Sequence, residues 1–410
     1  MKEENYRLGV DVGGTFTDIV LVDQDGTLFH TKTSSTPGSP EQGVIKGVMK
    51  ILEQRELALT DIRSLIHGTT VATNAVIEKA DKRAALITTK GFKDILEIGR
   101  QNRPHLYDFR DRKENPIISR NLIYELDERV LASGEIKKPI NEKETRNVVK
   151  RIKEENVESI AVCLLHSYIN PSHEETIKKI VSELFPEAHI SLSSEIYPEF
   201  KEYERMSTTS VNAYVAPVMD KYIGKLKGYL EEKSFTGRLN IMKSNGGMMS
   251  SRHARNQPVR TILSGPAGGA LAGKALTGKD NLIIADMGGT SFDVSLLHEG
   301  ELTLTKEREV AGNILRVPMI DINTLGAGGG SIAWVDTGGA LKVGPRSSGA
   351  NPGPACYGRG GHEPTVTDAH MALGRLNQEY LLDGDMQVFS EKAKKVIQDK
   401  IAKPLDMSLE

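Results

Sequence analysis

One stretch of the sequence occurs twice, and this repeat limits the folds that the chain can adopt. Residues 11–23, DVGGTFTDIVLVD, align without gaps to residues 286–298, DMGGTSFDVSLLH, with six of thirteen positions identical. The identical pairs are Asp11/Asp286, Gly13/Gly288, Gly14/Gly289, Thr15/Thr290, Asp18/Asp293 and Leu21/Leu296. Each copy lies between two apolar runs that are typical of strands. The repeat therefore predicts two strand–turn–strand units, each with an aspartate at the end of its first strand.

The residue types in the repeated turn favour phosphate binding. Paired glycines adopt backbone conformations closed to other residues and let phosphate oxygens approach the main chain. Because a carboxylate repels phosphate, Asp11 and Asp286 are predicted to hold hydrated Mg²⁺ or to orient an attacking group. Two such turns facing each other would clamp a triphosphate from both sides. The predicted nucleotide-binding residues are Gly13, Gly14, Thr15, Phe16, Thr17, Gly288, Gly289, Thr290 and Ser291.

Other interpretations of the repeat fit the sequence less well. Two ordinary hairpins, with glycines that only serve their turns, would not need the same Asp, Gly, Gly, Thr and distal Asp twice. Neither copy matches G-x-G-x-x-G or opens directly into a helix, as a Rossmann fingerprint would. The sequence also contains no G-x-x-x-x-G-K-S/T phosphate loop.

The composition disfavours several kinds of partner. The chain carries 53 Lys and Arg against 55 Asp and Glu, so no nucleic-acid or membrane-surface partner is predicted. Apolar runs such as AVCLL at 161–165 are too short to cross a bilayer, and no secretion signal is visible in MKEENYRLGV. The two cysteines, Cys163 and Cys356, lack metal-ligand spacing, which favours a reducing cytoplasm.

Strand and helix patterns alternate along the chain, which predicts an α/β fold. Strands are expected within 8–33, at SLIHG, AALITT and AVCLL, and in the second half at LNIMKSNGG, TILSGPAGG, NLIIADMGGT and LGAGGGSIAWVD. Helices are expected at 41–54, from about Val71, from Gly91, at 142–154, 172–184 and 389–402, and at 203–232 with an interruption at Pro217. Two domains are predicted. Residues 1–200 carry the first glycine turn and an inserted region at roughly 80–200, and residues 201–410 carry the second turn.

The paired turns resemble the phosphate 1 and phosphate 2 loops of the actin, Hsp70 and sugar-kinase superfamily. More narrowly, about the first 375 residues resemble the hydantoinase A / 5-oxoprolinase family, which includes acetone and acetophenone carboxylase subunits. The motifs that carry this resemblance are GVDVGGTFTD (9–18), HGTTVATNAVIE (67–78), GFKDILEIGRQNRP (91–104), NAYVAPVM (212–219), SNGGMM (244–249), LSGPAGG (263–269), ADMGGTSFDVS (285–295), GAGGGSIAWVD (326–336) and GANPGPACYGRGGHEPTVTDA (349–369). The resemblance implies an actin-like ATPase fold, related to ribonuclease H, with two domains around a nucleotide cleft.

By this resemblance the chain is expected to be an ATP- and Mg²⁺-dependent hydrolase subunit of the hydantoinase A, N-methylhydantoinase or 5-oxoprolinase type. It would phosphorylate a cyclic amide carbonyl before ring opening and would act with a hydantoinase B-like second subunit. An acetone or acetophenone carboxylase subunit, acting on a ketone, is an alternative enzyme. A nucleotide-dependent binding or regulatory module of the Hsp70–actin type is an alternative from another class. The superfamily's adenosine-binding turn is expected beyond about residue 410, which predicts a second domain that is incomplete at its C-terminus.

Two further glycine clusters are candidates for phosphate contact. Gly265 and Gly268 begin an alanine-rich helix, where free N–H groups and the helix dipole favour anions. Close helix packing through small residues is the alternative. Gly328, Gly329 and Gly330 belong to a run with more glycines than a turn requires, which predicts a phosphate or substrate contact or, alternatively, a hinge.

Three other side chains are of types that can take part in catalysis. His67, at the end of a predicted strand, is interpreted as an acid or base, with a satisfied interior histidine as the alternative. Asp368 in TVTDA is more simply a helix-capping residue than a metal ligand. Cys356 has no base at an informative spacing, so a catalytic thiol is not favoured.

Overall fold

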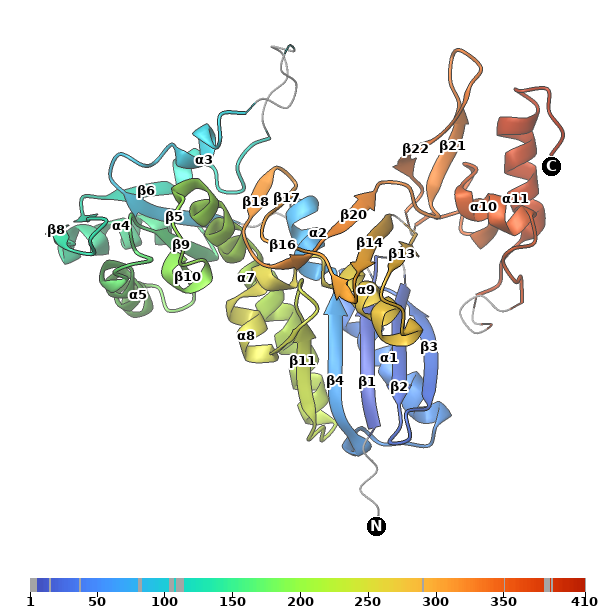
Figure 1. Cartoon of the computed structure of the whole chain (residues 1–410), viewed down its shortest axis with the longest axis horizontal. Helices are drawn as coiled ribbons and strands as arrows, with labels where there is room; N and C mark the ends of the chain where they lie inside the picture. Colours follow the sequence, from blue (N-terminus) through green and yellow to red (C-terminus); the bar gives the residue numbers. More distant parts are fainter. Residues whose placement is uncertain are drawn as a thin grey trace.

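The computed structural model describes residues 6–14, 16–36, 38–79, 83–102, 107, 114–289, 291–349, 351–379, 384 and 386–409. The fold is mixed α/β. Figure 1 shows a central sheet, a lobe on the left formed by the green and cyan middle of the chain, and several small sheets and helices formed by the orange and red last third.

The central sheet has six strands in the order β12-β11-β4-β1-β2-β3. β2 and β3 continue from β1 as antiparallel strands, whereas β4 and β11 run parallel to β1. The burial of β1 alternates, with Leu8, Val10 and Val12 buried, so Asp11 lies on the other face at the end of the strand. The bounds are β1 (Tyr6–Val12), β2 (Phe16–Val22), β3 (Leu28–Ser34), β4 (Ile62–Thr69), β11 (Arg238–Met242) and β12 (Met248–Ser250).

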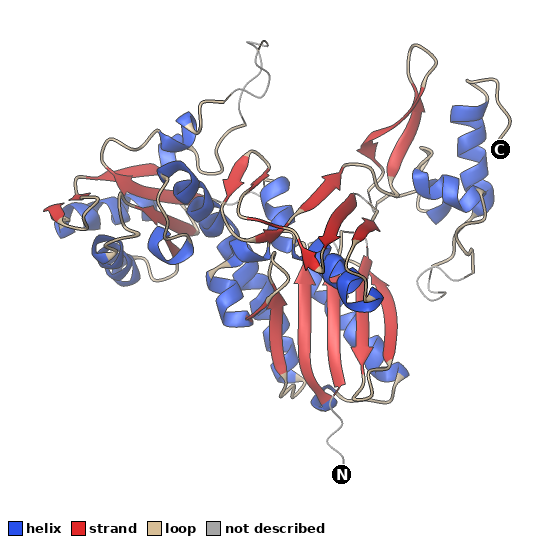
Figure 2. Ribbon diagram, in the orientation of Figure 1, coloured by secondary structure: helices blue, strands red, loops and turns tan. Residues whose placement is uncertain are grey.

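Two helices supply the apolar partner of this sheet. α1 (Pro40–Gln54) buries Val44, Val48 and Ile51 along one face, and α7 (Glu202–Glu232) adds residues near its C-terminal end. The helices lie behind the long strands in Figure 2. This packing fixes the position of the first glycine turn, because the turn joins β1 to β2 directly.

The lobe contains a four-stranded parallel sheet in the order β10-β9-β5-β6. β5 and β9 are buried along their whole length, as expected for a parallel sheet covered on both faces. This separate sheet lies within the region of roughly 80–200 that is expected to be inserted. Its elements are β5 (Ala84–Thr89), α3 (Ile95–Ile98), β6 (Ile123–Leu126), β7 (Arg129–Val130), β8 (Ile136–Lys138), α4 (Glu142–Glu154), β9 (Ser159–Cys163), α5 (Ser172–Leu184), β10 (His189–Leu192) and α6 (Ser193–Ile196).

The second copy of the repeat forms its own small sheet. β13 pairs with β14 in antiparallel fashion, and β14 also pairs with β15 and β20. Both predicted strand–turn–strand units are thus confirmed. The elements from α8 onward are α8 (Ser251–Asn256), α9 (Ser264–Thr277), β13 (Leu282–Met287), β14 (Phe292–His298), β15 (Glu301–Leu302), β16 (Leu304–Thr305), β17 (Arg308–Val310), β18 (Asn313–Leu315), β19 (Met319–Ile320), β20 (Ile322–Leu325), β21 (Ser331–Val335), β22 (Leu341–Ser347), α10 (Val366–Ala372) and α11 (Ser390–Ile397).

Three predicted elements differ from the observed ones. The helix expected from Gly91 is reduced to the single turn α3. The segment TILSGPAGG is not a strand, because Pro258–Thr261 form a 3₁₀ turn and Leu263 adopts a left-handed conformation with φ 62° just before α9. The expected interruption at Pro217 is also wrong, since α7 runs through it; the residues from Met206 to Pro217 are buried, and this packing offsets the lost backbone hydrogen bond.

The domain boundary expected near residue 200 stays a prediction. β11 and β12 follow that position in the sequence, yet they complete the sheet that β1 to β4 begin. Among the helices that the structure describes, none is long and apolar enough to cross a membrane.

Replacing Gly47 by alanine tests the close packing of α1 on β2. A Cβ at Gly47 would clash with Cδ1 of Ile19 and lie 2.8 Å from its Cγ1, and Ile19 is fully buried. Gly47→Ala should therefore lower the free energy of unfolding by about 1–3 kcal/mol, measured by urea denaturation. Gly228→Ala on α7 is the control. No atom lies within 4 Å of a Cβ there, so about 0.5–1 kcal/mol of stabilisation is expected. A Gly47→Ala variant as stable as the parent would contradict the packing.

Candidate functional site

The two glycine turns are closed by the same hydrogen bond. In the first turn the N–H of Gly13 donates to the carbonyl of Phe16 at 2.9 Å. In the second turn the N–H of Gly288 donates to the carbonyl of Ser291, also at 2.9 Å. The repeated sequence thus produces a repeated local structure.

Each hairpin also pairs two aspartates across its strands. Asp11 lies opposite Asp18, and Asp286 lies opposite Asp293 in the equivalent register. Residues directly opposite each other on antiparallel strands share a face. The repeat therefore places four carboxylates beside its two turns.

Helix α9 brings the two hairpins together. A Cβ at Gly265 would lie 3.2 Å from Oδ1 of Asp11, and a Cβ at Gly269 would lie 3.5 Å from Oδ2 of Asp286. Positions four apart on a helix are about 6 Å apart, so the two carboxylates lie within about 13 Å of each other. One helix thus faces both predicted metal-binding aspartates.

Hydrogen bonds fix the start of α9 against the first half of the chain. Ser264 Oγ accepts from the N–H of Thr69 at 3.3 Å and donates to the Thr69 carbonyl at 3.2 Å. The N–H of Leu263 donates to Oγ1 of Thr73 at 2.9 Å. Thr69 ends β4 and Thr73 belongs to α2 (Val71–Ile77), so α9 is tied to the elements beside the first turn.

The carboxylates of the site carry unfavourable charge. Protein atoms surround the Asp11 carboxylate, although part of the residue remains accessible to solvent. This burial, together with the charges of Asp18 and Asp286, raises the pKa of Asp11 to about 6. Lys32 opposes that rise. Burial and the carboxylates of Asp293 and Asp18 also raise the pKa of Asp286. A divalent cation would relieve the repulsion between these groups.

The donor set fits a hydrated magnesium ion better than a fully protein-coordinated metal. Within the described ranges, no three His, Cys, Asp or Glu side chains are close enough to hold one ion. Mg²⁺ usually keeps several waters and uses one or two carboxylates, which Asp11 and Asp286 can supply. The metal role of these two residues stays a prediction.

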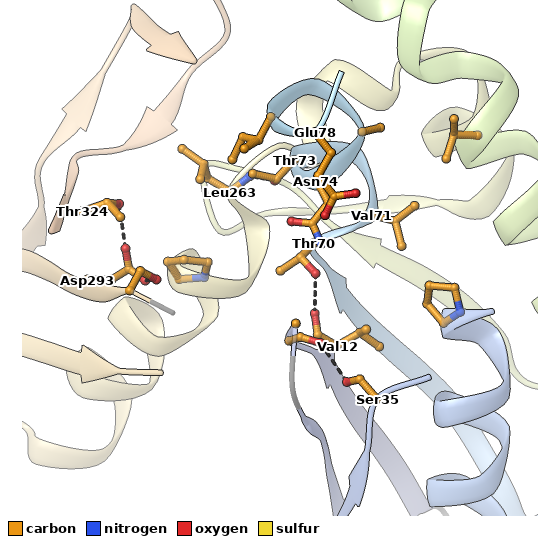
Figure 3. A pocket seen from close by; sticks show the side chains of 18 of the residues that line it. Val12, Ser35, Thr70, Val71, Thr73, Asn74, Glu78, Leu263, Asp293 and Thr324 are labelled. Carbon is orange, nitrogen blue, oxygen red and sulfur yellow. Dashed lines mark hydrogen bonds between the residues drawn. The ribbon is translucent and has the colours of Figure 1, made fainter. Parts of the chain in front are cut away.

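A cavity of about 770 Å³ lies between the two hairpins. Figure 3 shows Thr70, Asn74 and Glu78 on one side of it and Asp293 and Thr324 on the other. Both glycines of the first turn and the serine of the second turn line the cavity. Asp11 and Asp286, which precede the turns, are not part of the lining. The predicted residues in the lining are Gly13, Gly14 and Ser291.

Other predicted residues of the turns have different surroundings. Thr17 is fully buried, and its Oγ1 shares a hydrogen bond of 3.0 Å with Ser35 Oγ. Phe16 packs against a small apolar cluster formed by the C-terminal segment. Neither lines the cavity, so their predicted nucleotide contact finds no support in this geometry. Thr15 and Thr290 lie outside the described residues.

The glycine-rich loop at 326–331 supports the second turn. The N–H groups of Gly329 and Gly330 donate to the carbonyls of Gly288 and Gly289 at 2.9 and 2.6 Å. The N–H of Gly328 donates to Ser331 Oγ at 2.9 Å. All three N–H groups are therefore engaged within the protein, and the phosphate or substrate contact expected for these glycines stays a prediction.

Close approach explains two of the glycines in this loop, Gly329 and Gly330. A Cβ at Gly330 would lie 2.9 Å from the carbonyl oxygen of Gly289, and one at Gly329 would lie 2.7 Å from Oγ1 of Thr367. A Cβ at Gly268 on α9 would make ordinary van der Waals contact, 3.4 Å from Sδ of Met242. Of the two candidates on α9, only Gly265 faces a site carboxylate.

His67 has no access to the cavity. It is fully buried on β4, and its Nε2 lies 2.5 Å from the hydroxyl of Tyr222 on α7. Burial lowers the pKa of His67 to about 4, so the ring is neutral at physiological pH. His67 is thus a buried interior histidine whose Nδ1 has no hydrogen-bond partner in the described part of the chain, and its role as a catalytic acid or base stays a prediction.

Asp368 and Cys356 are structural. The buried Asp368 carboxylate accepts from the N–H groups of Ala355, Cys356 and Thr365, and it completes a capping box at the start of α10. Burial and the nearby Asp368 charge raise the pKa of the Cys356 thiol, which disfavours a thiolate nucleophile.

Two copies of one strand–turn–strand unit that share a cavity and meet at one helix define the class of this chain. The chain belongs to the hydantoinase/oxoprolinase family. The family model for the hydantoinase/oxoprolinase N-terminal region matches residues 7–185, and the hydantoinase/oxoprolinase model matches residues 205–410. The resemblance identified from the motifs is thereby confirmed.

Characterised relatives cover almost the whole chain. Caprolactamase subunit alpha of Pseudomonas jessenii is 40% identical over 100% of this chain and 60% of its own length. The 5-oxoprolinase of Saccharomyces cerevisiae is 36% identical over 92% of this chain and 32% of its own length. The nucleotide-free structure of acetone carboxylase superposes with a TM-score of 0.85 at 30% identity, over 99% of this chain and 60% of that one. The chain thus spans about 60% of the length of several relatives that it matches.

Replacing Asp11 by asparagine tests the charge repulsion in the site. Because the folded-state pKa of Asp11 is raised, its ionised form destabilises the fold above about pH 6, and this cost fades as the pH falls towards 3.8. Asp11→Asn should therefore raise Tm at pH 8, and the gain should shrink as the pH is lowered to about 4. Asp25→Asn in the exposed β2–β3 turn is the control and should not show this trend. A lower Tm for Asp11→Asn at pH 8 would contradict the repulsion.

Proposed function

We propose that this chain is the nucleotide-binding part of an ATP-dependent cyclic amide hydrolase of the hydantoinase A type. The observation that carries the proposal is the pair of matching glycine turns whose aspartates face one helix, α9. The 40% identity to a caprolactamase subunit over the whole chain supports the reaction type.

We also propose that the arrangement is actin-like. The strand order β3-β2-β1-β4-β11, with the first three strands antiparallel and the next two parallel to β1, supports this assignment. The second hairpin sheet would then belong to the other half of the nucleotide cleft.

In this proposal ATP lies with its phosphates between the turns that contain Gly13 and Gly288. The glycine backbone allows close approach of phosphate oxygens. Asp11 and Asp286 would hold Mg²⁺ through its waters, and the bound ion would supply positive charge beside the phosphates. Burial is the main cause of the raised pKa of Asp11, and the charges of Asp18 and Asp286 add to it; these neighbouring carboxylates supply the negative charge that would attract a cation.

The reaction balances as a phosphoryl transfer followed by hydrolysis. The amide carbonyl oxygen forms a bond to the γ-phosphorus of ATP while the bond to the bridging β–γ oxygen breaks, and ADP leaves. Water then adds to the activated carbon, the C–N bond breaks and the ring opens, and inorganic phosphate is released. Catalysis of the first step depends on positioning and on charge stabilisation.

A carboxylase subunit is the second candidate. The acetone carboxylase structure is the observation that favours it, because its TM-score of 0.85 extends over 99% of this chain. A carboxylase would activate a ketone with the same nucleotide site. The two candidate activities are therefore distinguished by which substrate stimulates ATP hydrolysis.

A second subunit and a cytoplasmic location complete the proposal. The caprolactamase and acetone carboxylase relatives are named as subunits alpha and beta. We therefore propose that the working enzyme contains a hydantoinase B-like partner. Cys163 and Cys356 are both unpaired and buried, which is compatible with a reducing compartment.

Phosphate release from the full-length chain assembled with its second subunit tests the function. Hydantoin, 5-oxoproline, ε-caprolactam or acetone should stimulate ATP hydrolysis, and Asp286→Asn should reduce it by about 10²-fold or more because the charge that holds the cation is lost. Asp280→Asn, exposed just before β13, is the control and should retain activity. Stimulation by unfolded polypeptide alone would instead support a binding module, and unchanged turnover in Asp286→Asn would make that residue structural.

A further inference from the structure

One wall of the cavity lies outside the two glycine turns. It is formed by α2 and by Val218 of α7. Val71, Asn74 and Glu78 recur along α2 at spacings of three and four, so they share one face of the helix. Other α2 residues, such as Ala72 and Val76, are buried in the core on the remaining side.

Hydrogen bonds hold this face beside the first glycine turn. Thr70 Oγ1 donates to the carbonyl of Val12 at 3.0 Å, and Val12 directly precedes Gly13. On the other side, Thr73 Oγ1 accepts from the N–H of Leu263 at the start of α9. A molecule bound against α2 therefore lies between elements that also position the turn.

Asn74 is the distinctive polar group of the wall. Its side chain is half-buried, lines the cavity and makes no hydrogen bond to any residue in the described part of the chain. A carboxamide offers two N–H donors and an acceptor, with which a ligand in the cavity could pair. Figure 3 shows Asn74 beside Glu78 and Thr70 at the cavity.

The neighbours of Asn74 are suited to an aliphatic ring. Val71 and Val218 are partly buried, and Ile77 is 56% exposed although it lines the cavity. Contact with a small ring would remove this apolar surface from water. An amide recognised here would therefore carry methylene groups on its far side.

We propose that the α2 wall is the subsite for the cyclic amide and that Asn74 pairs with the amide group of the substrate. The inference rests on the proposed hydrolase function. A small lactam or hydantoin ring holds its N–H and C=O on the same side. Asn74 Nδ2 then donates to the carbonyl oxygen while Oδ1 accepts from the ring N–H. The second lone pair of the carbonyl oxygen remains free to form the bond to phosphorus.

The test measures substrate-stimulated ATP hydrolysis by the full-length, assembled enzyme. The probe is whichever of hydantoin, 5-oxoproline and ε-caprolactam stimulates the wild type, together with its N-methylated analogue. Asn74→Ala and Asn74→Asp should lower kcat/KM for the amide at least tenfold. The dissociation constant for a non-hydrolysable ATP analogue with Mg²⁺ should change less than twofold.

The N-methylated analogue separates pairing from a structural role. Wild type should prefer the amide that carries an N–H at least tenfold, and Asn74→Ala should lose this preference. Asn74→Gln, which keeps the carboxamide, should recover part of the activity. Asn121→Asp, an exposed asparagine in the lobe, is the matched control and should behave as wild type.

The outcomes distinguish the two proposals. If no cyclic amide stimulates the wild type, the proposed function fails. If an amide stimulates the wild type and the Asn74 variants retain both kcat/KM and the preference for the N–H form, the subsite is wrong. Loss of ATP-analogue binding in folded Asn74 variants would also overturn it, because Asn74 would then serve the nucleotide.

Discussion

The close approach of α9 to two strand ends is the constraint on which the rest of the site depends. Gly265 leaves room for Asp11, and Gly269, one turn later, leaves room for Asp286. A Cβ at Gly265 would lie 3.2 Å from Oδ1 of Asp11 and would require a small shift, whereas one at Gly269 would make ordinary van der Waals contact with Asp286. The hydrogen bonds of Ser264 then fix the helix to the end of β4. One helix therefore holds together two hairpins that are far apart in the sequence.

This arrangement concentrates negative charge, which costs stability. The pKa values of Asp11 and Asp286 are raised by the burial of Asp11, by the partial burial of Asp286 and by the carboxylates that lie nearby. Lys32, which forms an ion pair with Asp18 at 2.8 Å, offsets only part of this charge. Electrostatic repulsion of this kind is typical of functional sites, where charged groups are positioned to bind a ligand rather than to stabilise the fold.

The α2 wall of the cavity has one side that packs in the core and another that faces the cavity. α2 buries its apolar side in the core and turns Asn74 and Glu78 towards the cavity. The loop at 326–331 performs a different task, since its N–H groups support the second turn from behind. The same residue type, glycine, thus serves turn formation, helix packing and loop contact at different places in the chain.

The sequence by itself determined the local features of this protein. The gapless repeat specified both hairpins, their register and the four aspartates, because pairing across a tight turn depends on neighbouring residues. Helical periodicity likewise gave α4 and α5 with their observed bounds. Only the tertiary structure decided that His67 is enclosed against Tyr222, that the loop glycines support the second turn and that Asn74 faces the cavity. These three arrangements depend on contacts between segments that are far apart in the sequence. A local sequence pattern does not specify which distant segment will pack against a given side of a helix or strand.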